Sequence, residues 1–214
     1  VMVGERSWSF LGGPGSWPYR VFDAQRRRLN RWLVDHLLSR TVLTGDGCVL
    51  EAGSGPGYGS SLFARHPAVR LSVALDFDPD ALQEARRRDP SLLVVLGDMR
   101  RLPFRSDIFD VVWNSSTLEH VGQPSHALGE MQRVTRAGGY VFVGVPYLFG
   151  PLGFQRLIAR TRVGVWIGPV FDRAALCRLV LAQGLQPVDS MVYFAACFIG
   201  VLSHKPVAVT HAPS

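Results

Sequence analysis

A short apolar strand that leads directly into alternating glycines constrains this chain more than any other feature. Residues 49–60 read VLEAGSGPGYGS, with glycine at positions 53, 55, 57 and 59. Glycine tolerates left-handed backbone and lets other groups approach the main chain closely. A strand, a glycine-rich turn and a helix in this order are typical of a binding turn for a nucleotide-like ligand at the end of a parallel strand.

The rest of the chain repeats this alternation of strand and helix. Apolar spacing predicts helices over 21–39, 79–88, 124–139 and 171–185, and a helix from the glycine turn to about residue 66. Apolar runs predict strands over 48–53, 70–78, 91–98, 109–116 and 140–146. The run MVYFAACFIGVLS at 191–203 is too short to span a bilayer and is interpreted as buried strand. This order predicts an α/β fold of one domain, with a Rossmann-like, doubly wound parallel sheet covered by helices on both faces.

The residues around the turn narrow the class of ligand. A phosphate loop needs Lys followed by Ser or Thr, which this stretch lacks, and the dinucleotide pattern needs glycine where Tyr58 stands. Glu51 ends the first strand, and an acid there suits a cationic group better than a pyrophosphate. Asp76 ends the second strand, where an acid can accept hydrogen bonds from ribose hydroxyls. A tight turn with helix-capping acids is the alternative, and it accounts less well for two acids on successive strands.

Four segments in register resemble the class I S-adenosylmethionine-dependent methyltransferases, a group that includes ubiquinone and menaquinone biosynthesis enzymes. They are VLEAGSGPGYGS, VALDFDPDAL, GDMRRLPFRSDIFDVVWNSSTLEHV and AGGYVFVGVP, within about 45–145. The resemblance implies a seven-stranded sheet, mostly parallel with an antiparallel last strand, and S-adenosylmethionine as cofactor with S-adenosylhomocysteine as product. It divides the single domain 1–214 into an arm and cover helix (1–44), a cofactor-binding core (45–146), a substrate-side lid insert (147–170) and a C-terminal helix with strands (171–206).

The resemblance also assigns cofactor contacts to particular residues. Glycines 53, 55 and 57 would pass under the cofactor, with the Glu51 carboxyl near its methionine end and the Asp76 carboxylate on the ribose. The adenine would lie between Phe77, Asp98 and Met99, and the methionine portion beside Asn114 and Ser115. The implied site residues are Glu51, Gly53, Gly55, Gly57, Asp76, Phe77, Asp98, Met99, Asn114 and Ser115.

Methyl transfer needs a general base only when the acceptor carries a proton that must leave. His120, just after the fourth strand, is the candidate catalytic residue, and a histidine that only holds the loop in shape is the alternative. Glu119 is a weaker candidate and is expected to be exposed. Aromatic side chains of the arm and the insert predict an apolar or aromatic small-molecule acceptor. They are Tyr19, Phe22, Tyr147, Phe149, Phe154 and Trp166.

Charge and composition leave several alternatives for partners. The net charge of +6 comes almost entirely from arginines, spread over 26–31, 86–88, 100–105 and 156–162, and solvated helix faces account for such runs. An RNA or protein methyltransferase and a cofactor-binding module without catalysis remain alternatives, although no specific nucleic acid is expected. Peripheral membrane contact through 148–162 also stays open, as does the oligomeric state. The three cysteines are not spaced as in metal-binding or redox motifs, so no metal is expected. A cytoplasmic location is expected because no secretory signal is recognised.

Overall fold

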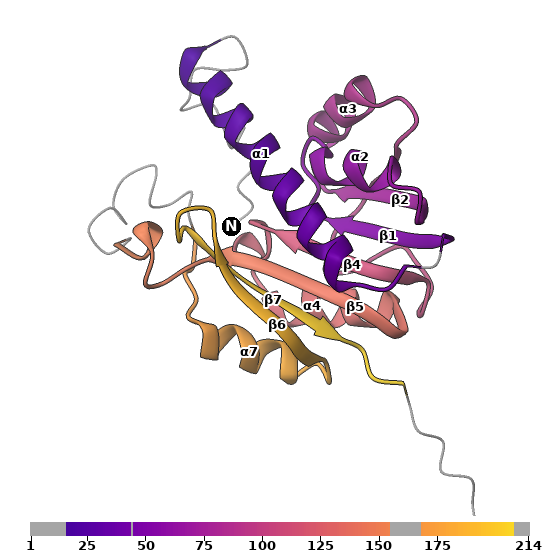
Figure 1. The fold of residues 1–214 in the computed structure, drawn as a ribbon, viewed down its shortest axis with the longest axis vertical. Helices are drawn as coiled ribbons and strands as arrows, with labels where there is room; N and C mark the ends of the chain where they lie inside the picture. The colour runs from indigo at the N-terminus through magenta and orange to yellow at the C-terminus, as the bar shows by residue number, and fades with distance from the viewer. Residues whose placement is uncertain (1–15, 44, 155–167, 208–214) are drawn as a thin grey trace, which may run out of the picture.

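The strand that carries the glycine turn, β1 (Gly47–Ala52), lies near the middle of a seven-stranded sheet in the computed structural model (Figure 1). The structure describes residues 16–43, 45–154 and 168–207. The strand order is β3-β2-β1-β4-β5-β7-β6, and β1 to β5 are parallel to one another. β7 runs antiparallel to both β5 and β6. The doubly wound sheet and its antiparallel last strand are therefore confirmed.

The remaining strands are β2 (Val69–Asp76), β3 (Leu93–Leu96), β4 (Phe109–Ser115), β5 (Thr135–Pro146), β6 (Gln186–Tyr193) and β7 (Phe198–His204). The helices are α1 (Trp17–Arg40), α2 (Tyr58–Ala64), α3 (Pro79–Arg88), α4 (Pro124–Val134) and α7 (Arg173–Leu181), with short 3-10 turns η2 (Leu118–His120) and η3 (Pro151–Phe154).

Helices cover both faces of the sheet, as predicted, and each face has its own apolar core. On one face, the carboxyl-terminal half of α1 buries Leu33 and Leu37 against β1, α2 and Trp113 of β4. α3 packs on the same side, where Ala85 meets Ala74 of β2. On the other face, α4 and α7 bury apolar side chains such as Met131 against alternate residues of the same strands. Both sides of the central strands are buried, which explains why the sequences of these strands are almost continuously apolar.

Local sequence signals set several of the helix starts. The Asp78 carboxylate accepts a hydrogen bond from the Asp80 backbone N–H at 2.9 Å, and Pro79 follows this cap as the first helical residue of α3. Asp172 caps α7 in the same way, through the Ala175 N–H at 2.6 Å. α1 begins four residues earlier than expected because Ser16 caps it, with its hydroxyl accepting from Tyr19 N–H.

Two further predicted elements are wrong in their extent. The helix predicted over 124–139 ends at Val134, and β5 begins at Thr135. The reason is tertiary, because Thr135 pairs with Phe109 at the start of β4. The apolar run 191–203 contains the ends of two strands, joined by a turn in which Phe194, Ala195 and Ala196 all have positive φ.

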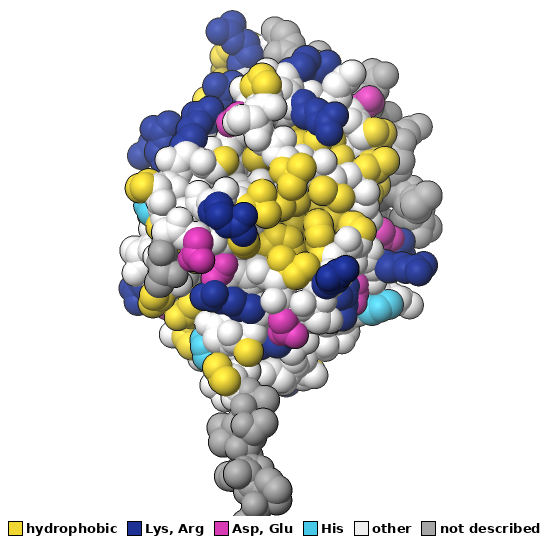
Figure 2. Space-filling model, turned by 90° about the vertical axis from the view of Figure 1, so that its right-hand side faces the viewer, with side chains coloured by type: hydrophobic (Ala, Val, Ile, Leu, Met, Phe, Trp, Pro, Cys, Tyr) yellow, Lys and Arg dark blue, Asp and Glu magenta, His cyan; other side chains and the backbone are white. Residues whose placement is uncertain are grey.

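Apolar and charged side chains are distributed unevenly over the surface of the molecule. Figure 2 shows a contiguous apolar patch in the middle of one face, with Lys and Arg side chains around it. Patches of this kind are common where a protein contacts another molecule. Among the described helices, none is both long enough and apolar enough to cross a membrane.

Candidate functional site

The carboxyl ends of the parallel strands bring the predicted cofactor residues to one edge of the sheet. Gly53 and Ser54 donate backbone hydrogen bonds to the Leu75 carbonyl at 2.8 and 2.9 Å, which joins the glycine turn to the end of β2. The Gly97 N–H donates to the Asp76 carbonyl at 2.9 Å, which brings the end of β3 beside them. This is the point where the strand order reverses around β1, the usual ligand-binding position in such sheets.

The four glycines of the turn serve different purposes. A Cβ at Gly53 would lie 2.5 Å from the Thr117 side chain, and one at Gly59 would lie 2.2 Å from Trp113. A Cβ at Gly57 would lie 3.0 Å from Ala85 and Leu92. These three glycines are therefore required by packing inside the protein.

Gly55 differs from the other three. It has a φ of +52°, and among the described residues only one atom outside its chain neighbours, Arg26 Nη2, lies within 4 Å of where its Cβ would be. The main chain at Gly55 is thus open to a ligand on one side. An open glycine cradle next to two acids fits an adenosyl ligand that carries a cationic sulfonium.

The two acids of the turn are buried and keep part of their hydrogen-bonding capacity. Asp76 accepts from the Gly55 N–H at 2.7 Å and from the Asp78 N–H at 2.9 Å, and burial raises its pKa despite these bonds. Glu51 accepts from both the backbone N–H and the hydroxyl of Ser60, and burial raises its pKa to about 8. Each carboxylate has about four acceptor positions, so both retain capacity for a ligand.

The remaining predicted cofactor residues lie at the same edge with differing exposure. Phe77 is exposed over 62% of its surface, whereas Met99 is buried in the core. Asp98 forms a partly exposed ion pair with Arg100, which holds the pKa of Asp98 below its usual value. Asn114 is fully buried: its amide donates to the Ala52 carbonyl and accepts from the Leu118 N–H at 3.1 Å. Asn114 therefore holds β1, β4 and η2 together at the strand ends.

The segment after β4 supplies the candidate catalytic histidine. His120 Nε2 lies 4.0 Å from Glu119 Oε1; the His120 side chain is 35% exposed, and its partial burial lowers its pKa. The expectation that Glu119 is exposed is wrong, because its side chain is buried, and among the described residues its carboxyl oxygen Oε2 has no hydrogen-bond partner. Burial raises the pKa of Glu119 to about 8. The nearby Ser115 hydroxyl lies 3.0 Å from the hydroxyl of Tyr193, a residue that no sequence motif singled out.

The predicted acceptor-side aromatics fall into three groups. Tyr147 and Phe149 follow β5 and form an edge-to-face pair with ring centroids 5.7 Å apart; Phe149 and Phe154 are exposed over 73% and 66% of their surfaces. Tyr19 and Phe22 are half-buried on α1. Trp166 lies outside the described residues.

Comparison with known proteins agrees with this arrangement. Residues 50–143 match the family model described as "Methyltransferase domain". A Mycobacterium tuberculosis protein named "Probable S-adenosylmethionine-dependent methyltransferase" is 36% identical over 152 residues, which are 66% of this chain and 55% of the relative. The demethylmenaquinone methyltransferase of Renibacterium salmoninarum is 38% identical over 119 residues, 56% of this chain and 48% of the relative. The chain spans about half the length of these two relatives.

Solved structures share the fold at low sequence identity. A chain in the complex between the Haloferax volcanii Trm112 methyltransferase activator and its methyltransferase partner superposes with a TM-score of 0.74 at 18% identity, covering 94% of this chain and 97% of that one. An S-adenosylmethionine-dependent methyltransferase of Mesorhizobium loti gives a TM-score of 0.66 at 14% identity, covering 80% and 96%. Residues 50–143 are therefore a methyltransferase domain, the curated relatives that the chain matches include S-adenosylmethionine-dependent methyltransferases, and the chain has the class I methyltransferase fold.

Proposed function

We propose that this chain transfers a methyl group from S-adenosylmethionine to an oxygen, nitrogen or carbon atom of a hydrophobic small molecule. The assignment of the cofactor rests on one observation: the main chain at Gly55 is open and lies between two buried acids. Gly55 and the Glu51 and Asp76 carboxylates would hold the cofactor, with Asp98 and Phe77 at its adenine end. When bound, the cofactor supplies an activated methyl group on a sulfonium.

The exposed aromatic side chains at the same edge support an apolar acceptor. Phe149 and Phe154 expose most of their rings, although such side chains are usually buried. Rings of this kind commonly line sites for small apolar ligands and keep water from the reacting atoms. The Renibacterium salmoninarum relative is named a demethylmenaquinone methyltransferase, which supports a small-molecule acceptor for this chain.

The cofactor assignment can be tested by calorimetric titration with S-adenosylhomocysteine. Asp76→Asn should weaken binding by about 1–3 kcal/mol, because a buried hydrogen-bonded carboxylate is replaced by a neutral amide. Asp80→Asn, on the exposed first turn of α3, serves as the matched control and should bind like the wild type. If Asp76→Asn binds S-adenosylhomocysteine as tightly as Asp80→Asn does, the role given to Asp76 is contradicted. If the wild-type chain binds no S-adenosylhomocysteine, the proposed function is contradicted.

His120 is the proposed general base for an acceptor that loses a proton. The lowered pKa keeps its imidazole neutral at pH 7, the form that can accept a proton. With an acceptor found by screening, His120→Gln should reduce kcat by about 10²- to 10⁴-fold and leave the affinity for S-adenosylhomocysteine unchanged. The wild-type rate should fall as the pH drops through the pKa of His120. A variant that keeps the wild-type rate and pH profile would leave His120 a structural role only.

A further inference from the structure

The amino-terminal half of α1 extends beyond the sheet and passes over the glycine turn (Figure 1). Its arginines belong to a run that the sequence assigns to a solvated helix face, but Arg26 is half-buried. We propose that the Arg26 guanidinium binds the carboxylate of the cofactor's methionine portion, with the Glu51 carboxyl facing the ammonium group of the same portion. This inference rests on the proposed function and adds a residue outside the methyltransferase domain to its site.

The position of Arg26 carries the inference. Its Nη2 atom lies 3.3 Å from the point where a Gly55 Cβ would stand, over the one glycine of the turn that internal packing does not explain. The guanidinium carbon lies 5.6 Å from the centroid of the Phe22 ring and 5.7 Å from that of Tyr58. The two rings offer the cation apolar surface on the protein side. A cation held at a ligand-facing glycine is placed to contact a ligand.

The charges around Arg26 match an amino acid zwitterion. Burial lowers the pKa of Arg26, and the negative charges of Asp23 and Glu51 oppose that shift. A desolvated guanidinium gains most from a carboxylate, which it can bind through two parallel hydrogen bonds. An ammonium group close to Glu51 would in turn favour the ionised form of that buried carboxyl. With the ammonium group bound, the Arg26 guanidinium and the ionised Glu51 carboxyl would therefore complement the two charges of a methionine group.

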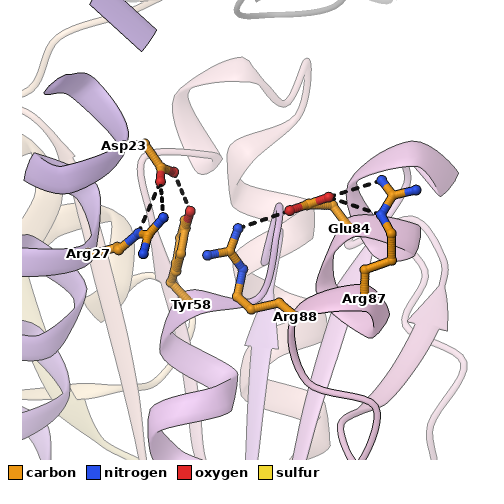
Figure 3. A network of polar contacts seen from close by, with 6 residues as sticks. All are labelled: Asp23, Arg27, Tyr58, Glu84, Arg87 and Arg88. Atoms are coloured by element: carbon orange, nitrogen blue, oxygen red, sulfur yellow. Dashed lines mark hydrogen bonds and ion pairs between the residues drawn. The ribbon is translucent and has the colours of Figure 1, made fainter. Parts of the chain in front are cut away.

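A separate network holds α1 in the position that this contact needs. The Tyr58 hydroxyl donates to Asp23, and Arg27 donates to the same carboxylate through Nε at 3.0 Å and Nη2 at 2.6 Å (Figure 3). The Arg88 guanidinium of α3 lies 3.8 Å from the centre of the Tyr58 ring. Tyr58 directly follows Gly57, so the helix that carries Arg26 is fastened to the glycine turn itself. Arg27 donates to Asp23, and Arg26 Nη2 lies beside Gly55.

Two ligands that differ only in the amino acid portion test the inference. S-Adenosylhomocysteine carries the carboxylate and the ammonium, and 5′-methylthioadenosine keeps the adenosine and the thioether but lacks both charges. By calorimetry, Arg26→Gln should weaken S-adenosylhomocysteine binding about 10- to 100-fold and leave 5′-methylthioadenosine binding unchanged. Arg26→Lys, which keeps the charge, should recover part of the loss. Arg31→Gln, at an exposed position of the same helix, should bind both ligands like the wild type.

The outcomes separate this inference from the proposed function. Equal weakening of both ligands by Arg26→Gln would mean that Arg26 only supports the shape of the turn, and would overturn the inference. Unchanged affinity for S-adenosylhomocysteine in that variant would also overturn it, with the cofactor assignment intact. If the wild-type chain binds neither ligand, the proposed function fails first.

Discussion

At the scale of single residues, burial decides the charge of Glu119. The carboxyl is buried, and one of its oxygens has no hydrogen-bond partner in the part of the chain that the structure describes, so its pKa rises from the ordinary value of 4.5 to about 8. Between these two pH values the folded chain keeps the proton and the unfolded chain releases it. The folded state therefore binds more protons, and the free energy of unfolding falls as the pH rises through this range.

Glu119→Gln should remove this contribution, because the amide has nearly the same shape and does not titrate. The slope of unfolding free energy against pH between about 4.5 and 8 should become flatter, by at most about 1.4 kcal/mol per pH unit. Urea unfolding at a series of pH values measures the slope. Some slope should persist, since Glu51 has a similarly raised pKa. The exposed control Asp35→Asn should keep the wild-type slope, and an identical slope in Glu119→Gln would show that the buried carboxyl does not titrate as described.

At the scale of elements, α1 is attached to the core by two different kinds of contact. Its carboxyl-terminal half is held by apolar packing through Leu33, Val34 and Leu37. Its amino-terminal half has a single buried side chain among its described residues, Asp23, which is held by hydrogen bonds to Tyr58 and Arg27. Polar contacts of this kind contribute less than a packed core, so the two halves should differ in local stability.

Tyr58→Phe removes the hydroxyl that donates to Asp23 and should cost about 1–2 kcal/mol of stability. Hydrogen exchange should quicken in residues 17–28 while residues 33–40 keep their protection. Tyr140→Phe, on β5, makes the same chemical change and should leave exchange in 17–28 as in the wild type. Uniform loss of protection along the whole helix in Tyr58→Phe would argue that α1 opens as one unit.

At the scale of the whole molecule, the sheet is stable only when both of its faces are covered. The face under α1 buries Val49, Phe63 and Trp113, and these side chains would meet water if the helix were displaced. Leu33, with no exposed surface, is at the centre of this contact. The cover helix is thus part of the hydrophobic core as well as of the proposed site.

Leu33→Ala should lower the free energy of unfolding by about 2–5 kcal/mol, because it leaves a cavity between α1 and the sheet. Val21→Ala, at a 41% exposed position of the same helix, should change it by no more than about 0.5 kcal/mol. Urea unfolding followed by circular dichroism gives both values. A small effect at Leu33 would mean that the sheet keeps its structure without this contact.

The sequence by itself determined the order of strands and helices, the coverage of both faces and the acids at the strand ends. These follow from apolar periodicity, glycine and capping residues, which act within a few positions along the chain. Only the tertiary structure decided that Gly55 faces outward while Gly53, Gly57 and Gly59 are fixed by Thr117, Ala85 and Trp113. It also selected Arg26 from a run of arginines and buried Glu119, because exposure and charge at these positions depend on atoms from distant parts of the chain.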